Sequence, residues 1–97
     1  MDRLQLLVFS FYREDASINK RLEPLKKCKL MRSGGSIRIE CIDREHMEEI
    51  SQLFKYIKLP FEALGLARQI VVRVEGEPQR NFSIEEEHSI LRYLLEQ

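Results

Sequence analysis

The first apolar run of the chain, Arg3–Tyr12 (RLQLLVFSFY), leaves no polar side when it is read as an extended strand. Successive side chains of a strand point to opposite faces, and here both alternating sets are apolar. One set is Leu4, Leu6 and Val8, and the other is Leu7, Phe9 and Phe11. A strand that is apolar on both faces is typical of the centre of a covered sheet. The pattern therefore predicts that Arg3–Tyr12 is a central strand.

The next segment, Arg13–Pro24, has a weaker pattern with two interpretations. Asp15 is a residue type that caps helices, and Ile18 and Leu22 would then share one face of the helix. Pro24 would end such a helix, because proline has no backbone N–H to donate. The pattern predicts a short helix here, and an ordered loop is the alternative.

A β-hairpin is predicted for Leu25–Ile42, around the turn Ser33-Gly34-Gly35-Ser36. A two-residue Gly-Gly loop suits the positive φ angles of the turns that join antiparallel strands. With this loop setting the register, apolar residues face each other and so do opposite charges, as cross-strand pairing favours. The facing pairs are Leu30 with Ile39, Lys29 with Glu40, and Cys28 with Cys41. A longer turn would shift this register.

Residues Asp43–Leu59 carry the clearest helical pattern. Asp43 is a good N-cap, and the apolar positions recur at helical spacing and form one stripe. These positions are Met47, Ile50, Leu53, Phe54 and Ile57. Pro60 is expected to interrupt the helix, with one further turn over Phe61–Leu64 that Gly65 ends as a C-cap.

The last third of the chain predicts one strand and one helix. Arg68–Glu75 (RQIVVRVE) is a strand whose buried face is Ile70, Val72 and Val74. The sequence Gly76-Glu77-Pro78 predicts a turn after it. Ser83 and Glu86 have the spacing of a capping box, so a helix is expected to begin at Ser83. Its apolar face would be Ile84, His88, Leu91 and Leu95, flanked by Leu94.

The predicted order of elements is β-(α)-β-β-α-β-α, which is an α+β fold. Without the last helix this order resembles the ferredoxin-like, or split βαβ, arrangement. That resemblance is one of element order only, and the arrangement hosts many unrelated functions. The alternative is a three- or four-stranded antiparallel sheet backed by two helices, which would apply if the first helix is a loop.

The length of 97 residues fits a single domain over residues 1–97. No run approaches the roughly 20 apolar residues that a membrane-spanning helix needs, so no membrane association is expected. The two cysteines follow no leader of the secretory type. They therefore predict a reducing compartment, the cytoplasm.

The formal net charge is zero, which weighs against a protein that binds nucleic acid over its whole surface. The charge is uneven, however: residues 1–43 hold nine Lys and Arg against six Asp and Glu, and residues 44–97 hold seven against ten. The basic side chains in and near Lys20–Arg32 are candidate contacts for a protein partner or for nucleic acid. They are Lys20, Arg21, Lys26, Lys27, Lys29, Arg32 and Arg38. A solvated sheet edge, protected from aggregation by its lysines, is the alternative interpretation.

The two cysteines and two histidines are the next candidates for chemistry. Cys28 and Cys41, facing each other on paired strands, would form a redox-switchable disulfide or share a metal. Two thiols supply only half of a zinc site, and two thiols buried as small apolar groups are the simpler interpretation. His46 and His88 lie near glutamates, but neither belongs to a complete ligand set such as HExxH. No metal and no cofactor are therefore expected.

The segment KLPFEALGLA contains an apolar cluster of Phe61, Leu64 and Leu66 beside two helix-breaking residues. The cluster is expected to cap the core, and any exposed part of it is a candidate interface with a partner or with a second copy. The turn sequence RSGGS lacks the lysine and spacing of a phosphate-binding loop, and no serine lies in a nucleophile elbow. No catalytic residue is predicted.

The sequence therefore favours a small, non-enzymatic cytoplasmic interaction module, an adaptor or regulator that binds a protein partner or forms a homodimer. The alternative function is a nucleic-acid-binding module that uses the basic Lys20–Arg32 region.

Overall fold

The computed structural model describes residues 1–84. Its helices are α1 (Arg3–Phe11), α2 (Ala16–Arg21), the 3₁₀-helix η1 (Glu23–Lys27), α3 (Arg44–Gln52) and α4 (Phe54–Ala63). Its strands are β1 (Lys29–Ser33), β2 (Ser36–Glu40), β3 (Gln69–Arg73) and β4 (Arg80–Ser83). The mixture of helices with a four-stranded sheet confirms the predicted α+β class.

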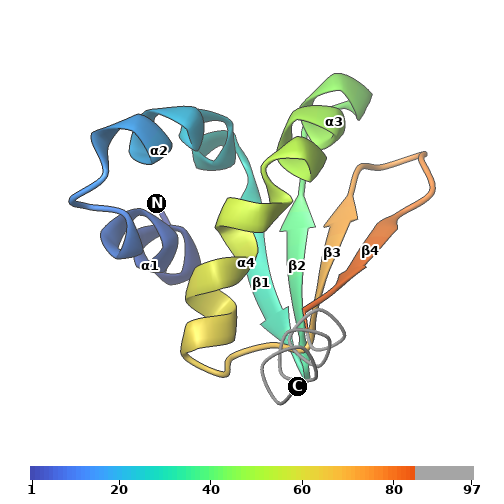
Figure 1. Ribbon diagram of the computed structural model, residues 1–97. Coiled ribbons are helices and arrows are strands. Elements are labelled where there is room, and N and C mark those ends of the chain that lie inside the picture. The colour runs from blue at the N-terminus through green and yellow to red at the C-terminus, as the bar shows by residue number, and fades with distance from the viewer. Residues whose placement is uncertain (85–97) are drawn as a thin grey trace, which may run out of the picture.

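The four strands form one sheet in the order β1-β2-β3-β4. The β1–β2 and β3–β4 pairs are antiparallel, whereas β2 and β3 are parallel. Parallel neighbours need a crossover connection, which α3 and α4 provide. The described helices gather on one side of the sheet (Figure 1). That side covers the buried strand residues Leu30, Ile37, Ile39, Ile70 and Val72.

The β1–β2 hairpin has the predicted register. Lys29 pairs with Glu40, and Leu30 pairs with Ile39. Gly34 has φ +58°, as in a turn with glycine at its first central position. The prediction that the Gly-Gly turn sets the pairing is therefore confirmed.

The prediction of a strand over Arg3–Tyr12 is wrong, because this segment is helix α1. Asp2 caps the helix: its Oδ1 accepts from the backbone N–H of Gln5 at 2.8 Å, and Gln5 Oε1 accepts from the N–H of Asp2 at 2.8 Å. This reciprocal pair is a capping box. The second carboxylate oxygen of Asp2 accepts from the N–H of Leu30, 3.2 Å away, and so joins the start of α1 to β1.

Since α1 is a helix, the chain lacks the strand that would begin a ferredoxin-like arrangement. The alternative of a purely antiparallel sheet is also wrong, because β2 and β3 are parallel. The fourth strand is instead β4, which the sequence did not predict and which pairs with β3 through Ile70 and Phe82. Ser83, expected to begin a helix, is the last residue of β4, and the rest of that predicted helix lies outside the described residues.

The short helix after Asp15 is confirmed as α2, since the side chain of Asp15 accepts from the N–H of Ile18 at 3.0 Å. Pro24 does not end helical structure, because it occupies the first turn of η1, where a missing N–H is tolerated. The N-cap role of Asp43 is confirmed by a 2.8 Å bond from the N–H of His46.

The interruption predicted at Pro60 is wrong, because the break falls at Leu53 and Pro60 lies inside α4. Proline at this position removes the hydrogen bond that its N–H would donate to the carbonyl of Tyr56, four residues earlier. That carbonyl accepts instead from the hydroxyl of Tyr12, at 2.6 Å. The C-terminal end of α1 thus supplies the hydrogen bond that Pro60 cannot make. The helix ends as predicted, before Gly65 at φ +63°.

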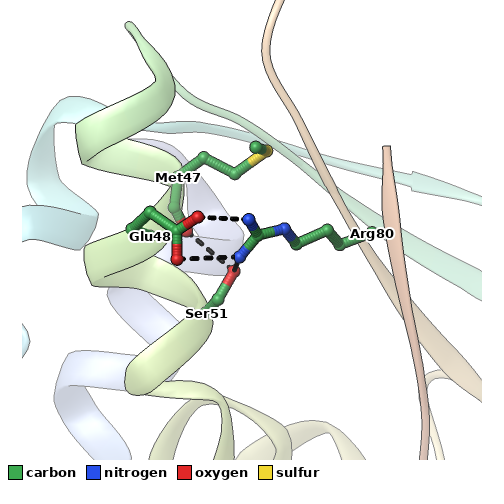
Figure 2. Close-up of polar contacts among 4 residues, drawn as sticks. All are labelled: Met47, Glu48, Ser51 and Arg80. Atoms are coloured by element: carbon green, nitrogen blue, oxygen red, sulfur yellow. Dashed lines mark hydrogen bonds and ion pairs between the residues drawn. The ribbon is translucent and has the colours of Figure 1, made fainter. Parts of the chain in front are cut away.

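A polar contact holds α3 against β4 (Figure 2). Arg80 donates through Nη1 to Oε2 of Glu48 at 3.0 Å, and through Nη2 to Oε1 of the same carboxylate. Nη1 also lies 3.4 Å from the hydroxyl oxygen of Ser51, which itself donates to the carbonyl of Met47 at 2.8 Å. Hydrogen bonding to Arg80 lowers the pKa of Glu48 below its usual value. The bidentate geometry fixes α3 over the sheet.

Among residues 1–84, no helix combines the length and the apolar content needed to cross a membrane.

Candidate functional site

Helix α1 has two apolar faces, and only one of them is buried. The inward face contains Val8, Phe9 and Tyr12, with exposed fractions of 0%, 8% and 7%. Leu6 and Phe11, on the outward face, are both 48% exposed. An amphipathic surface helix normally presents charged or polar residues to solvent, so two large apolar side chains on the outward face of α1 are unusual.

Gln5 fixes the orientation of α1 near its first turn. Its side chain is only 3% exposed, and its Nε2 donates to the carbonyls of Leu25 at 2.9 Å and Cys28 at 2.7 Å. A weaker contact of 3.3 Å reaches the carbonyl of Lys26. Because these carbonyls belong to η1 and the residue before β1, Gln5 holds α1 to the segment that leads into the sheet.

Tyr12 fixes the other end of α1 through the hydroxyl that donates to Tyr56. Burial, followed by the nearby Tyr56 and Asp15, raises the pKa of Tyr12 to about 12. The hydroxyl therefore keeps its proton and remains a donor at neutral pH. With Gln5 and Tyr12 both bonded on the inward face, the helix cannot rotate to bury Leu6 and Phe11 without breaking these buried hydrogen bonds.

The outward face of α1 lines a groove of about 620 Å³. Leu6, Leu7 and Phe11 form its apolar side, and Leu64, at the C-terminal end of α4, closes it. Leu64 is 58% exposed. Three large apolar side chains, from two helices distant in sequence, are thus about half exposed around one concave surface. We call this surface the α1–α4 groove.

Charged side chains stand at the two ends of the α1–α4 groove. Arg3 is at the first turn of α1, and Arg13 and Glu14 follow its last turn; all three line the groove and are exposed. Within residues 1–84, no carboxylate forms an ion pair with Arg3 or Arg13. The groove therefore combines an apolar floor with a small excess of positive charge.

The apolar cluster predicted from the sequence is divided by the structure. Phe61 is fully buried in the core, and Leu66 is half-buried and packs against it. Leu64 alone is well exposed, and it lines the α1–α4 groove. The predicted cluster thus contributes one residue to the candidate site.

The seven basic residues predicted as contacts lie on four elements and not on one surface. They are Lys20 and Arg21 in α2, Lys26 and Lys27 in η1, Lys29 and Arg32 in β1, and Arg38 in β2. We call the side of the sheet opposite the described helices its open face. The alternation of the strands places Lys29 and Arg38 on this open face and Arg32 on the face toward the helices. Lys26 pairs with Glu23 at 3.0 Å.

A second cluster lies at the far end of the hairpin from its turn. The sulfurs of Cys28 and Cys41 and a ring nitrogen of His46 are within 4.8 Å of one another. The distance from Cys28 Sγ to His46 Nε2 is 3.5 Å. Cys28 and His46 are each 7% exposed, and Cys41 is half-buried. The facing of the two cysteines predicted from the register is therefore confirmed, and His46 joins them.

Two further predictions lie outside the described residues. They are the position of His88 and the capping role of Glu86 in the last predicted helix.

Sequence reasoning missed the outward face of α1 and its two buried polar side chains. Gln5 looked like one polar residue within a strand, although Asp2 and Gln5 have the spacing of a capping box, a pattern that indicates a helix start. Tyr12 and Pro60 gave no such indication, because their connection runs between helices far apart in the sequence.

Comparisons with known proteins give no family to which the chain can be assigned. No protein-family model, no curated protein and no solved structure matches it. The geometry of residues 1–84 is therefore the sole basis for a functional proposal.

Proposed function

We propose that this protein is a non-enzymatic, cytoplasmic interaction module that binds an acidic amphipathic helix of another protein in the α1–α4 groove. The observation that carries the proposal is the outward face of α1, where Leu6 and Phe11 are each 48% exposed beside Leu64 at 58%. Grooves of this kind accept the apolar face of a helix through side chains spaced three or four residues apart.

The charge of the rim selects the kind of helix. Arg3 and Arg13 stand at opposite ends of the groove without ion pairs to the described carboxylates, and Glu14 is the one acidic residue among the described residues of its lining. Acidic side chains flanking the apolar face of the partner would complement the two arginines and speed association. The residues from Arg3 to Arg13 span about 15 Å at 1.5 Å per residue. A partner helix of about three turns would therefore reach both arginines.

The nucleic-acid alternative has less support. The open face of the sheet carries Lys29, Arg38 and Arg73, but Arg73 lies 3.6 Å from Glu40 and Lys29 faces the same carboxylate. No aromatic side chain of residues 1–84 lies on that face to stack on a base.

The test uses two designed helical peptides with the same leucines at helical spacing. One has glutamates on its polar face and the other has lysines. The acidic peptide is expected to bind and to shift the NMR signals of Leu6, Leu7 and Phe11, with affinity falling as salt is added. The substitution Leu6→Glu should weaken this binding at least about tenfold, which corresponds to about 1.4 kcal/mol.

Met31→Glu is the matched control, since Met31 is an exposed apolar residue, 37% accessible, on the open face of the sheet. It should leave the affinity unchanged. Equal binding of both peptides, or no effect of Leu6→Glu, would contradict the proposal. Sedimentation that shows a wild-type dimer, converted to monomer by Leu6→Glu, would replace the acidic helix with a second copy as the occupant.

A further inference from the structure

The backbone places Cys28 and Cys41 at a position where a cross-strand disulfide fits. Extending the β1–β2 register by one residue beyond the Lys29–Glu40 pair brings the two cysteines opposite each other. The N–H of Cys41 donates to the carbonyl of Arg73 in β3, at 2.7 Å, and so points away from β1. Cysteines facing each other without exchanging backbone hydrogen bonds have Cα atoms about 4.5 Å apart, which lies within the range of disulfides.

The hydrogen bonds of His46 argue against a metal at this cluster. The N–H of Ile42 can only donate, and it lies 3.0 Å from Nδ1 of His46, so Nδ1 carries no proton. The carbonyl of Pro24 can only accept, and it lies 2.8 Å from Nε2, so Nε2 carries the proton. A metal ligand needs a free nitrogen lone pair, with the other ring N–H given to an acceptor. In His46 the lone pair of Nδ1 already accepts from Ile42, and Nε2 carries the proton that it donates to Pro24. Neither nitrogen therefore has a free lone pair for a metal.

The two thiols differ in pKa and in exposure. Hydrogen bonding from Cys28 lowers the pKa of Cys41, although burial and the charges of Glu40 and Asp43 oppose this shift. The same hydrogen bond, together with burial, raises the pKa of Cys28. Cys41 is also the more exposed of the two. It is therefore the thiol that ionises first and that a reagent reaches first.

We infer that Cys28 and Cys41 are a reversible dithiol site that reacts with low-molecular-weight disulfides. The Cys41 thiolate attacks one sulfur of the external disulfide, forms a mixed disulfide and releases the first small thiol. Cys28 then loses its proton to solvent and attacks the sulfur of Cys41 as a thiolate, and the second small thiolate leaves and takes up a proton. Two protein thiols are oxidised to one disulfide, and one external disulfide is reduced to two thiols.

The carboxylates beside Cys41 define which disulfides react fastest. Glu40 precedes Cys41, Asp43 follows it by two residues, and both act on its thiol electrostatically. A reagent that carries positive charge, such as cystamine, should therefore react faster than neutral hydroxyethyl disulfide. Glutathione disulfide, which is anionic, should be the slowest of the three.

The experiment treats the reduced full chain with each disulfide and follows free thiols and intact mass over time. The wild type is expected to lose both thiols and reach the mass of an intramolecular disulfide, without dimers. Cys28→Ser should instead accumulate the mixed disulfide on Cys41. Cys41→Ser should leave Cys28 unreacted while the chain stays folded.

Three results would overturn the inference. The first is a wild type that keeps both thiols, or that forms only linked dimers, under all three reagents. The second is equal reaction of Cys28 and Cys41 in the single variants. The third is binding of one Zn²⁺ by the reduced chain that protects both thiols and is lost in His46→Ala, since that outcome makes the cluster a metal site. The wild-type time course is decisive even if a serine variant fails to fold.

Discussion

Helices α1 and α3 each contain nine residues and each begin at an aspartate cap, but they meet solvent in opposite ways. In α3 the buried residues are His46, Met47 and Ile50, and the other positions carry charged or polar side chains. In α1 the buried residues are Gln5, Val8 and Phe9, and the exposed positions include Leu6 and Phe11 beside Arg3 and Ser10.

The two helices differ in whether their outward side chains find a suitable environment in the folded chain. The outward side chains of α3 are solvated, or they bond as Glu48 bonds to Arg80 (Figure 2). Leu6 and Phe11 instead leave about half of their surface, 48% each, open to solvent. Burying apolar area is favourable by about 25 cal/mol per Å², so α1 retains a driving force for association that α3 has already used or does not have.

The largest effects should come from comparing two phenylalanines on the two faces of α1. Phe9→Ala removes a ring that is 8% exposed, and it should lower the free energy of unfolding by about 3–5 kcal/mol. Phe11→Ala removes a ring that is 48% exposed, and it should change that free energy by less than about 1 kcal/mol. Urea unfolding followed by circular dichroism measures both.

The same pair separates stability from binding. Phe11→Ala should weaken binding of the acidic helical peptide while the protein remains stable. If Phe11→Ala instead destabilises the protein as much as Phe9→Ala, the outward face of α1 belongs to the core and the α1–α4 groove is not a free surface.

A smaller effect should reveal what holds the outward face of α1 in place. Tyr12→Phe leaves the carbonyl of Tyr56 without a donor, because Pro60 has no N–H to replace the hydroxyl. This carbonyl is part-buried, so its cost should lie toward the lower end of the roughly 1–3 kcal/mol of a buried acceptor left without its partner. In a Pro60→Ala background the new N–H can bond Tyr56 within the helix, so Tyr12→Phe should cost less there.

A double-mutant cycle of Tyr12→Phe and Pro60→Ala measures this dependence. The coupling free energy is expected to exceed about 0.5 kcal/mol, the usual error of additivity between distant sites. Strictly additive losses would show that Tyr12 does not compensate for Pro60, and the orientation of α1 would then rest on Gln5 and packing.

The contrast between α1 and α3 also explains which elements the sequence could predict. A helix with one apolar stripe, as in α3, gives a period that no strand shares. A helix with two apolar faces, as in α1, also satisfies the alternation of a strand covered on both sides. Only the capping pair Asp2 and Gln5 distinguished the two, and such a pair is a weak indicator beside ten residues of apolar pattern.

The remaining errors have separate causes. Strand β4 escaped prediction because Phe82 is the single apolar residue in Arg80–Ser83, and four residues are too few to show a period. Pro60 was assigned to a break because the residue that compensates for it, Tyr12, is distant in sequence. The hairpin was predictable in detail because its turn, Gly34-Gly35, fixes every pair that follows.

The candidate site was predicted in part, for the same reasons. Leu64 was identified from its own neighbourhood, whereas Leu6 and Phe11 were assigned to a buried strand. The two cysteines were placed opposite each other because the hairpin register is local. His46 joined them only through the packing of α3 on η1, which no pattern within either segment specifies.

The smallest effect concerns the polar face of α3, where Glu48→Gln tests whether the ion pair of Glu48 with Arg80 stabilises the folded protein. Arg80 lowers the pKa of Glu48 below its ordinary value of 4.5, so the carboxylate stabilises the folded protein above that pH. This contribution is lost as the pH falls through the lowered folded-state value. The pair is exposed, so the loss in Glu48→Gln at neutral pH should be a small decrease in the urea midpoint. The difference from wild type should vanish in acid, where the protonated Glu48 of the wild type is as neutral as the glutamine of the variant.

Glu49→Gln is the control, as it neutralises an exposed neighbour that forms no ion pair among the described residues. A deficit of Glu48→Gln that persists in acid, or that Glu49→Gln reproduces, would mean that Arg80 does not hold α3 to β4 through this carboxylate.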